Sequence, residues 1–166
     1  MNDGLLKARL EKRAKDEEEN RNMLVTLNHF VKNDDARQLL LNLWLVIQAW
    51  DDAEDGDPHD HAPAYKQAVI DLPNNPLYIP CHLPLLIKQL WLDWTCANEY
   101  ERGREVDHLH KAYMLRAGYY RVIITLVDLT EGTDAAQEKA PRIWRCYGES
   151  YPEFEAEVLC QIQSPE

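Results

Sequence analysis

ARQLLLNLWLVIQAWDDAEDG, residues 36–56, is the stretch with the clearest structural signal in this chain. Its apolar residues recur every three or four positions, which places them on one broad face of a helix. The three preceding residues, Asn33, Asp34 and Asp35, are of the types that cap a first helical turn. Gly56 commonly ends a helix. The stretch therefore predicts an amphipathic helix that ends at Gly56.

Two longer segments, residues 84–102 and residues 105–130, show the same periodicity. Their apolar faces are formed by Leu86, Leu90, Trp94 and Ala97 in the first, and by Val106, Leu109, Tyr113, Ala117, Tyr120, Ile124 and Val127 in the second. Because only a short link at Gly103 separates them, we expect an antiparallel pair of long helices in the core. The strand-like residues 122–125 lie inside the second pattern, which favours a buried helix there.

Prolines divide the rest of the chain into shorter helices. Pro63 opens a helix that runs through residue 71, and Pro152 opens one that runs through about residue 162. Pro141 lies inside a helical pattern over 134–147, where we expect a kink or a split. Together these signals predict an all-α fold, a single-domain bundle of about six to eight helices.

The N-terminal region differs from the rest of the chain in composition. Residues 4–22 are rich in good helix formers but carry only a thin apolar stripe, whereas residues 23–32 form a short amphipathic pattern. We therefore predict a charged N-terminal helix or arm over residues 1–22 and one helical domain over residues 23–166. The 166 residues, 45% of them hydrophobic, are enough for one core.

The charge and the cysteines exclude several classes of function. A net charge of −11 disfavours binding to nucleic acid or to anionic membranes, both of which need surplus Lys and Arg. The four cysteines contain no CxxC pair, so zinc-finger and redox motifs are not supported. The charged N-terminus is not a secretory signal, and no apolar run is long enough to span a bilayer. We expect a soluble protein in the reducing cytoplasm of a bacterial host.

The end of the first amphipathic pattern carries an acidic cluster. Asp51, Asp52 and Asp55 form a DDxxD pattern, and Asp57 extends it. Hard divalent cations prefer several carboxylate oxygens close together, so this cluster is a candidate site for Mg²⁺, Mn²⁺ or Ca²⁺. Acids at a helix C-terminus are also unfavourable by about 0.3–1 kcal/mol each, which a bound cation would relieve. The alternative is an acidic helix end that runs into a solvated loop.

Other charged residues are more typical of ion pairs than of a catalytic site. Arg116 lies at the edge of the apolar face of the 105–130 pattern, where it could pair with Asp51 or Glu54 or form one wall of an anion pocket. The acids of the turn near Gly103 have Arg102 and Arg104 beside them, which favours a solvated, neutralised turn. The chain contains no Gly-rich phosphate loop, no GxSxG and no HExxH. We therefore assign no catalytic residue.

Three stretches together carry a resemblance. These are the Trp50-DDAEDGD run, the LRAGYYRVIITLVDLTEG pattern at 115–132 and the tail with Trp and Tyr. This combination, over roughly residues 36–150, resembles small helical proteins of bacteriophages and prophages. The resemblance implies an origin in a phage genome and an accessory role against the host, and it implies no particular reaction.

Three hypotheses for the function follow. The leading one is a small acidic, phage-type accessory protein, not an enzyme, that binds a host or phage protein through acidic and aromatic surface. The second is a divalent-metal-dependent enzyme that acts on a phosphorylated or nucleotide substrate through Asp51, Asp52 and Asp55, with Arg116 facing the phosphate. The third is a homo-oligomer with a structural role.

Overall fold

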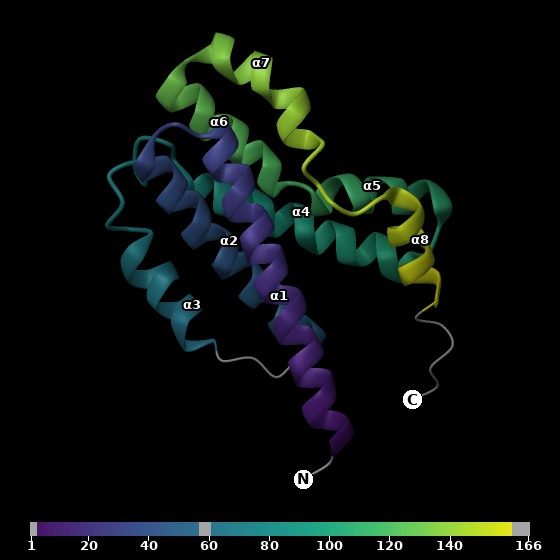
Figure 1. The fold of residues 1–166 in the computed structure, drawn as a ribbon. Helices are drawn as coiled ribbons and strands as arrows, with labels where there is room; N and C mark the ends of the chain where they lie inside the picture. Colours follow the sequence, from purple (N-terminus) through teal and green to yellow (C-terminus); the bar gives the residue numbers. More distant parts are fainter. Residues whose placement is uncertain (1–2, 57–60, 161–166) are drawn as a thin grey trace. The chain divides into compact units, whose positions relative to one another are not determined.

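The computed structural model describes residues 3–56 and 61–160, and for residues 3–16 and Asp55 it describes only the backbone. Every regular element in this part of the chain is a helix, so the predicted all-α class is confirmed (Figure 1). The helices are α1 (Asp3–Phe30), α2 (Asp34–Asp55), α3 (Ala62–Lys66), the π-helical η1 (Gln67–Asp71), α4 (Leu83–Gly103), α5 (Val106–Arg116), α6 (Tyr119–Glu131), α7 (Thr133–Trp144) and α8 (Tyr151–Cys160). The chain forms two compact units, Met1–Tyr78 and Ile79–Glu166. The single domain that the sequence predicts over residues 23–166 stays a prediction.

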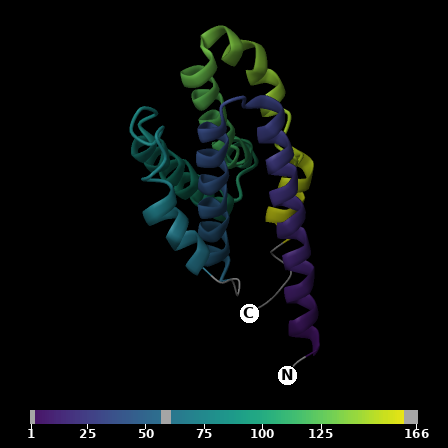
Figure 2. The ribbon, with the colours of Figure 1, turned by 60° about the vertical axis from the view of Figure 1, so that its left-hand side comes forward.

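In the first unit, α1 and α2 lie side by side (Figure 2). The sequence suggested two separate helices over 4–22 and 23–32, but the structure has one continuous helix to Phe30. No proline and no glycine lies between residues 5 and 30, and most of these residues are good helix formers, so nothing ends the first helix. Met23, Leu27 and Phe30 are buried along its last turns.

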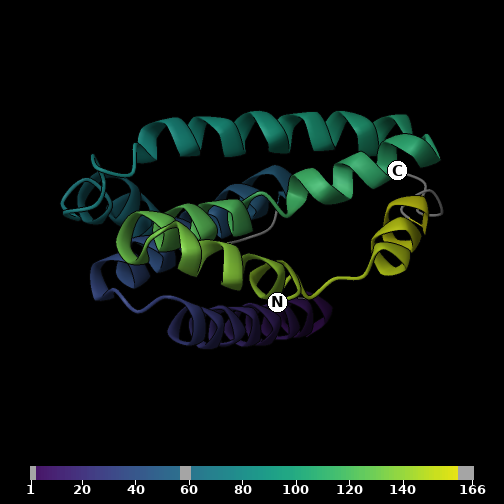
Figure 3. The ribbon, with the colours of Figure 1, turned by 90° about the horizontal axis from the view of Figure 1, so that it is seen from above.

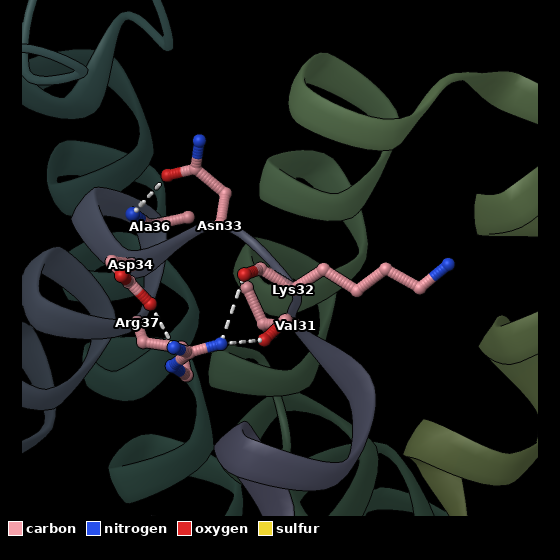
Figure 4. A network of polar contacts seen from close by, with 6 residues as sticks. All are labelled: Val31, Lys32, Asn33, Asp34, Ala36 and Arg37. Carbon is pink, nitrogen blue, oxygen red and sulfur yellow. Dashed lines mark hydrogen bonds and ion pairs between the residues drawn. The ribbon is translucent and has the colours of Figure 1, made fainter.

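The link between α1 and α2 confirms the predicted cap. The side chain of Asn33 accepts a hydrogen bond of 2.9 Å from the N–H of Ala36 (Figure 4). The guanidinium of Arg37 pairs with Asp34 and also donates to the carbonyl oxygens of Val31 and Lys32, at 2.7 and 3.0 Å. One side chain thus ties the end of α1 to the start of α2. The other end of α2 is also as predicted, because Gly56 adopts the left-handed conformation with φ 71° and its N–H donates to the carbonyl of Asp52.

The α3 segment follows the prediction from Pro63, which lies in the first turn of the helix. The helix continues to Asp71, but its last five residues form the wider π-helical turn η1. Lys66 spans this turn with two contacts of 2.7 and 2.8 Å to the carboxylate of Asp71.

In the second unit, α4 and α5 lie side by side and are joined only by Arg104 and Glu105 (Figure 3). The antiparallel pair is present, but the prediction of one helix over 105–130 is wrong. The chain breaks at Ala117 and Gly118 and continues as α6. Gly118 is a weak helix former, and a Cβ there would lie only 3.1 Å from a methyl carbon of Leu90. The break thus lets the corner between α5 and α6 approach α4 closely.

The remaining helices agree with the sequence except at their ends. Residues 122–125 are helical, and Val122 and Ile123 are buried, as expected. α6 and α7 lie side by side, α7 passes through Pro141 without a split, and it ends at Trp144, not at residue 147. Pro152 lies in the first turn of α8. A core cluster of this unit joins three helices, with Ala97 from α4, Leu109 and Ala112 from α5, and Phe154 and Val158 from α8.

The cap of α2 gives a direct test of the local structure. Replacing Asn33 by Ala removes the acceptor for the N–H of Ala36, so we expect a loss of about 1 kcal/mol in the free energy of unfolding, measured by urea denaturation. The control is Asn33→Asp, which keeps a side-chain acceptor and should retain most of the stability. Equal losses in the two variants would contradict a capping role for this side chain.

Candidate functional site

The structure describes only part of the acidic cluster. Asp52 is buried and Asp51 is half-buried, both in the last turns of α2. The side chain of Asp55 and all of Asp57 lie outside the described residues. Among the residues that are described, no group of three or more His, Cys, Asp or Glu side chains is placed to hold a metal ion. The divalent-cation site therefore stays a prediction.

Arg116 lies at the centre of a polar network in the second unit. Its Nε and one terminal nitrogen contact the two carboxylate oxygens of Glu101, each at 2.8 Å, in a bidentate pair. The same terminal nitrogen donates to the side-chain oxygen of Asn98 at 2.6 Å. The guanidinium carbon lies 5.6 Å from the ring centre of Trp94. All three partners come from the face of α4 that meets α5, so this one side chain fastens the two helices together.

This geometry identifies the ion-pair partner of Arg116 within the second unit. The pair with Glu101 is a structural ion pair, with both side chains about four-fifths buried, at 23% and 19% exposure. The partners predicted from the sequence, Asp51 or Glu54, both belong to the other unit. A contact of Arg116 with either residue stays a prediction. The sequence pointed to Arg116 by its place at the edge of the apolar face but missed Glu101, which it had grouped with the solvated turn. In that turn Arg102 does pair with Glu99, as expected.

A second group of contacts fastens the link between α7 and α8. The hydroxyl of Tyr113 donates to the carbonyl of Glu149 at 2.5 Å, and that of Tyr120 donates to the carbonyl of Cys146 at 2.9 Å. The hydroxyl of Tyr147 donates to the carboxylate of Glu149 at 3.0 Å. Tyrosine hydroxyls thereby supply hydrogen bonds to two backbone carbonyls of the link between α7 and α8.

Two side chains of this link have perturbed acidities. Burial, followed by the negative charge of Glu149, raises the pKa of Tyr147. Burial also raises the pKa of Glu149, and the nearby charge of Glu157 acts in the same direction, while the hydrogen bond from Tyr147 and the charge of Arg116 oppose the rise. A half-buried carboxyl with a raised pKa can mark a functional site. Here the contacts of its neighbours hold the α7–α8 link in place, which is a structural role.

Most aromatic side chains of the second unit face one another. His110 stacks on Tyr151 with ring centres 3.8 Å apart, and Tyr100 stacks on His108 at 4.8 Å. Tyr113 contacts the rings of Tyr147, Tyr151 and Phe154. The tyrosines of this unit are therefore largely engaged in packing within it.

The outer face of α4 is different, because it exposes large apolar side chains. Leu85, Trp91 and Leu92 are 65%, 46% and 51% exposed. Trp91 leans against Trp94, with ring centres 5.5 Å apart. Ala97 is buried, as its place in the apolar pattern predicts, but that pattern did not include this second face. The signal was present in Leu85 and Leu92, which lie seven residues apart and so two turns apart on one side of a helix.

Comparison of the chain with protein-family models, with curated proteins and with solved structures yields no match. Within the described residues, no helix combines the length and the apolar character needed to cross a membrane. None of the four cysteines, all of which lie in the described residues, forms a disulfide.

The raised pKa of Glu149 predicts a pH-dependent effect of substitution. Its pKa is higher in the folded chain than its ordinary value of 4.5, so the ionised carboxylate opposes folding above the folded pKa, and this cost disappears as the pH falls below 4.5. Glu149→Gln keeps an acceptor for Tyr147 without the charge. We expect a higher Tm than the wild type at pH 7 and no difference at low pH, measured by circular dichroism.

The matched control is Glu155→Gln, because Glu155 also accepts a hydrogen bond from a tyrosine, Tyr151, at 3.0 Å. This control should leave Tm nearly unchanged at both pH values. A Glu149→Gln variant that is less stable than the wild type at pH 7 would contradict the account of this carboxyl.

Proposed function

We propose that this protein acts by binding another protein, as a small accessory protein of the phage type, and that the outer face of α4 makes the contact. The observation that carries the proposal is the exposure of Leu85, Trp91 and Leu92 on one face of a regular helix. Single apolar residues are common on protein surfaces, but several together on one helix face are typical of an interaction site.

The composition of this face supports the proposal. Tryptophan is enriched among the residues that contribute most to protein–protein binding, and Trp91 is both exposed and braced by a neighbouring ring. Leu85 and Leu92 lie two turns apart on one side of α4, and helices enter the apolar grooves of a partner by such a face. The chain has a net charge of −11, yet Lys88 is the charged residue in the middle of this apolar patch. The acidic surface would therefore flank the contact and keep the protein soluble in the absence of its partner.

The contacts on the inner face of α4 support the same proposal. Arg116 and its partners hold the inner face against α5, and the buried carboxylate of Asp93 pairs with Arg121 of α6. Because these contacts fix the rotation of α4, the outer face is presented in one orientation without ordering on binding. A preformed face of this kind binds with a smaller entropic cost.

The test is affinity capture from lysates of several bacterial backgrounds with the wild type and with Leu92→Glu. A carboxylate at the centre of an apolar contact would have to be desolvated, so we expect the captured partner to fall by more than about tenfold. The matched control is Met114→Glu on α5, because Met114 is 54% exposed against 51% for Leu92. Equal capture by the wild type and both variants would contradict the proposal, as would the absence of any reproducible partner.

A further inference from the structure

The outer face of α4 has a regular seam along its whole length. Its residues alternate in spacing between three and four positions, which is the pattern by which one helix packs along another. The seam consists of Leu85, Lys88, Leu92, Thr95, Glu99 and Arg102. Thr95 is half-buried and the other five are exposed. The inner face of α4, by contrast, packs against other helices of the same chain.

The seam carries three charged residues, Lys88, Glu99 and Arg102. Lys88 and Glu99 are eleven residues apart, or about three turns, so they project from the same side of α4. Glu99 pairs with Arg102 in its own chain, and its side chain remains 71% exposed. Lys88 has no ion pair with any residue that the structure describes. A positive charge, Lys88, therefore lies near one end of the seam, and an exposed carboxylate, Glu99, lies near the other end beside Arg102.

A second copy of the same seam complements this arrangement when it runs antiparallel. A two-fold axis between residues 93 and 94 places Lys88 opposite Glu99 of the second copy, and Glu99 opposite its Lys88. The same axis places Leu92 opposite Thr95, and Leu85 opposite the aliphatic stem of Arg102. A parallel pair would instead place like charges against each other at both positions, which is unfavourable.

We propose that the outer face of α4 binds the same face of a second copy of this chain, antiparallel and with two-fold symmetry. The inference rests on the proposed function in one respect, that this face is a protein-binding surface, and it names a partner for it. Such an interface uses one patch twice and closes on itself, so it gives a dimer and no larger assembly. A contact made by one helix alone is smaller than the roughly 1,600 Å² of a standard interface, so the dimer should dissociate on dilution.

The test is sedimentation velocity of the full chain over the micromolar concentration range. The wild type should show a concentration-dependent dimer. Lys88→Glu and Glu99→Lys should each weaken it by at least about tenfold, because each places two pairs of like charges across the axis. The double variant Lys88→Glu/Glu99→Lys exchanges the signs and should restore the dimer to within a few-fold of the wild type.

An equimolar mixture of the two single variants gives an independent readout. One copy then carries two acids on the seam and the other two lysines, so the mixture should form a heterodimer while each variant alone is monomeric. Matched controls for the change in net charge are Arg145→Glu and Glu138→Lys, both at exposed positions outside α4, and these should dimerise like the wild type.

The outcomes separate this inference from the proposed function. A wild type that stays monomeric at all concentrations, or a double variant that stays as weak as the single ones, overturns the dimer. Either result leaves the binding of another protein open to the capture test with Leu92→Glu. Recovery of the dimer in the double variant together with heterodimer formation in the mixture establishes the antiparallel pairing.

Discussion

The bidentate contact between Arg116 and Glu101 is the constraint on which the arrangement of the Ile79–Glu166 unit depends. A guanidinium that meets both carboxylate oxygens must lie in one plane with them, so the pair fixes how α5 is rotated about α4. Asn98 and Trp94 add contacts on the same side of α4. Once this side is committed to α5, the opposite side, with Leu85 and Leu92, has to face outward.

The side chains of this unit with perturbed pKa values take part in contacts that hold its helices together. Tyr147 and Glu149 are held by neighbouring rings and by hydrogen bonds that satisfy the link between α7 and α8. Burial raises the pKa of both side chains. The charge of Glu149 raises the pKa of Tyr147 further, whereas the hydrogen bond from Tyr147 lowers the pKa of Glu149. These contacts fasten the short helices α7 and α8 to the rest of the unit.

Local signals in the sequence predicted local structure well. The cap at Asn33, the stop at Gly56 and the first turns at Pro63 and Pro152 are all where the residue types placed them, because each depends on a few neighbouring backbone groups. The break at Gly118 was missed because the apolar stripe continues across it, and the reason for the break is the approach of Leu90 from another helix.

Contacts between residues far apart in the sequence were harder to predict, because they depend on how separate helices pack. The partner of Arg116 depends on which faces of two helices meet, which periodicity alone does not specify. The outer face of α4 was overlooked because its inner face already accounted for a regular apolar stripe. The acidic cluster at residues 51–57 was the most conspicuous feature of the sequence, but the described part of the structure adds no further ligand to it.

Hydroxyl-radical footprinting of the full chain at low and high protein concentration tests the central claim most directly, because it measures the solvent access of individual side chains. The account predicts that oxidation of Leu85, Trp91 and Leu92 decreases as the concentration rises, while that of Met114, which is equally exposed but lies on α5, stays constant. Oxidation of the α4 residues that remains unchanged with concentration and on addition of bacterial lysate would contradict it, since the outer face of α4 would then bind no partner.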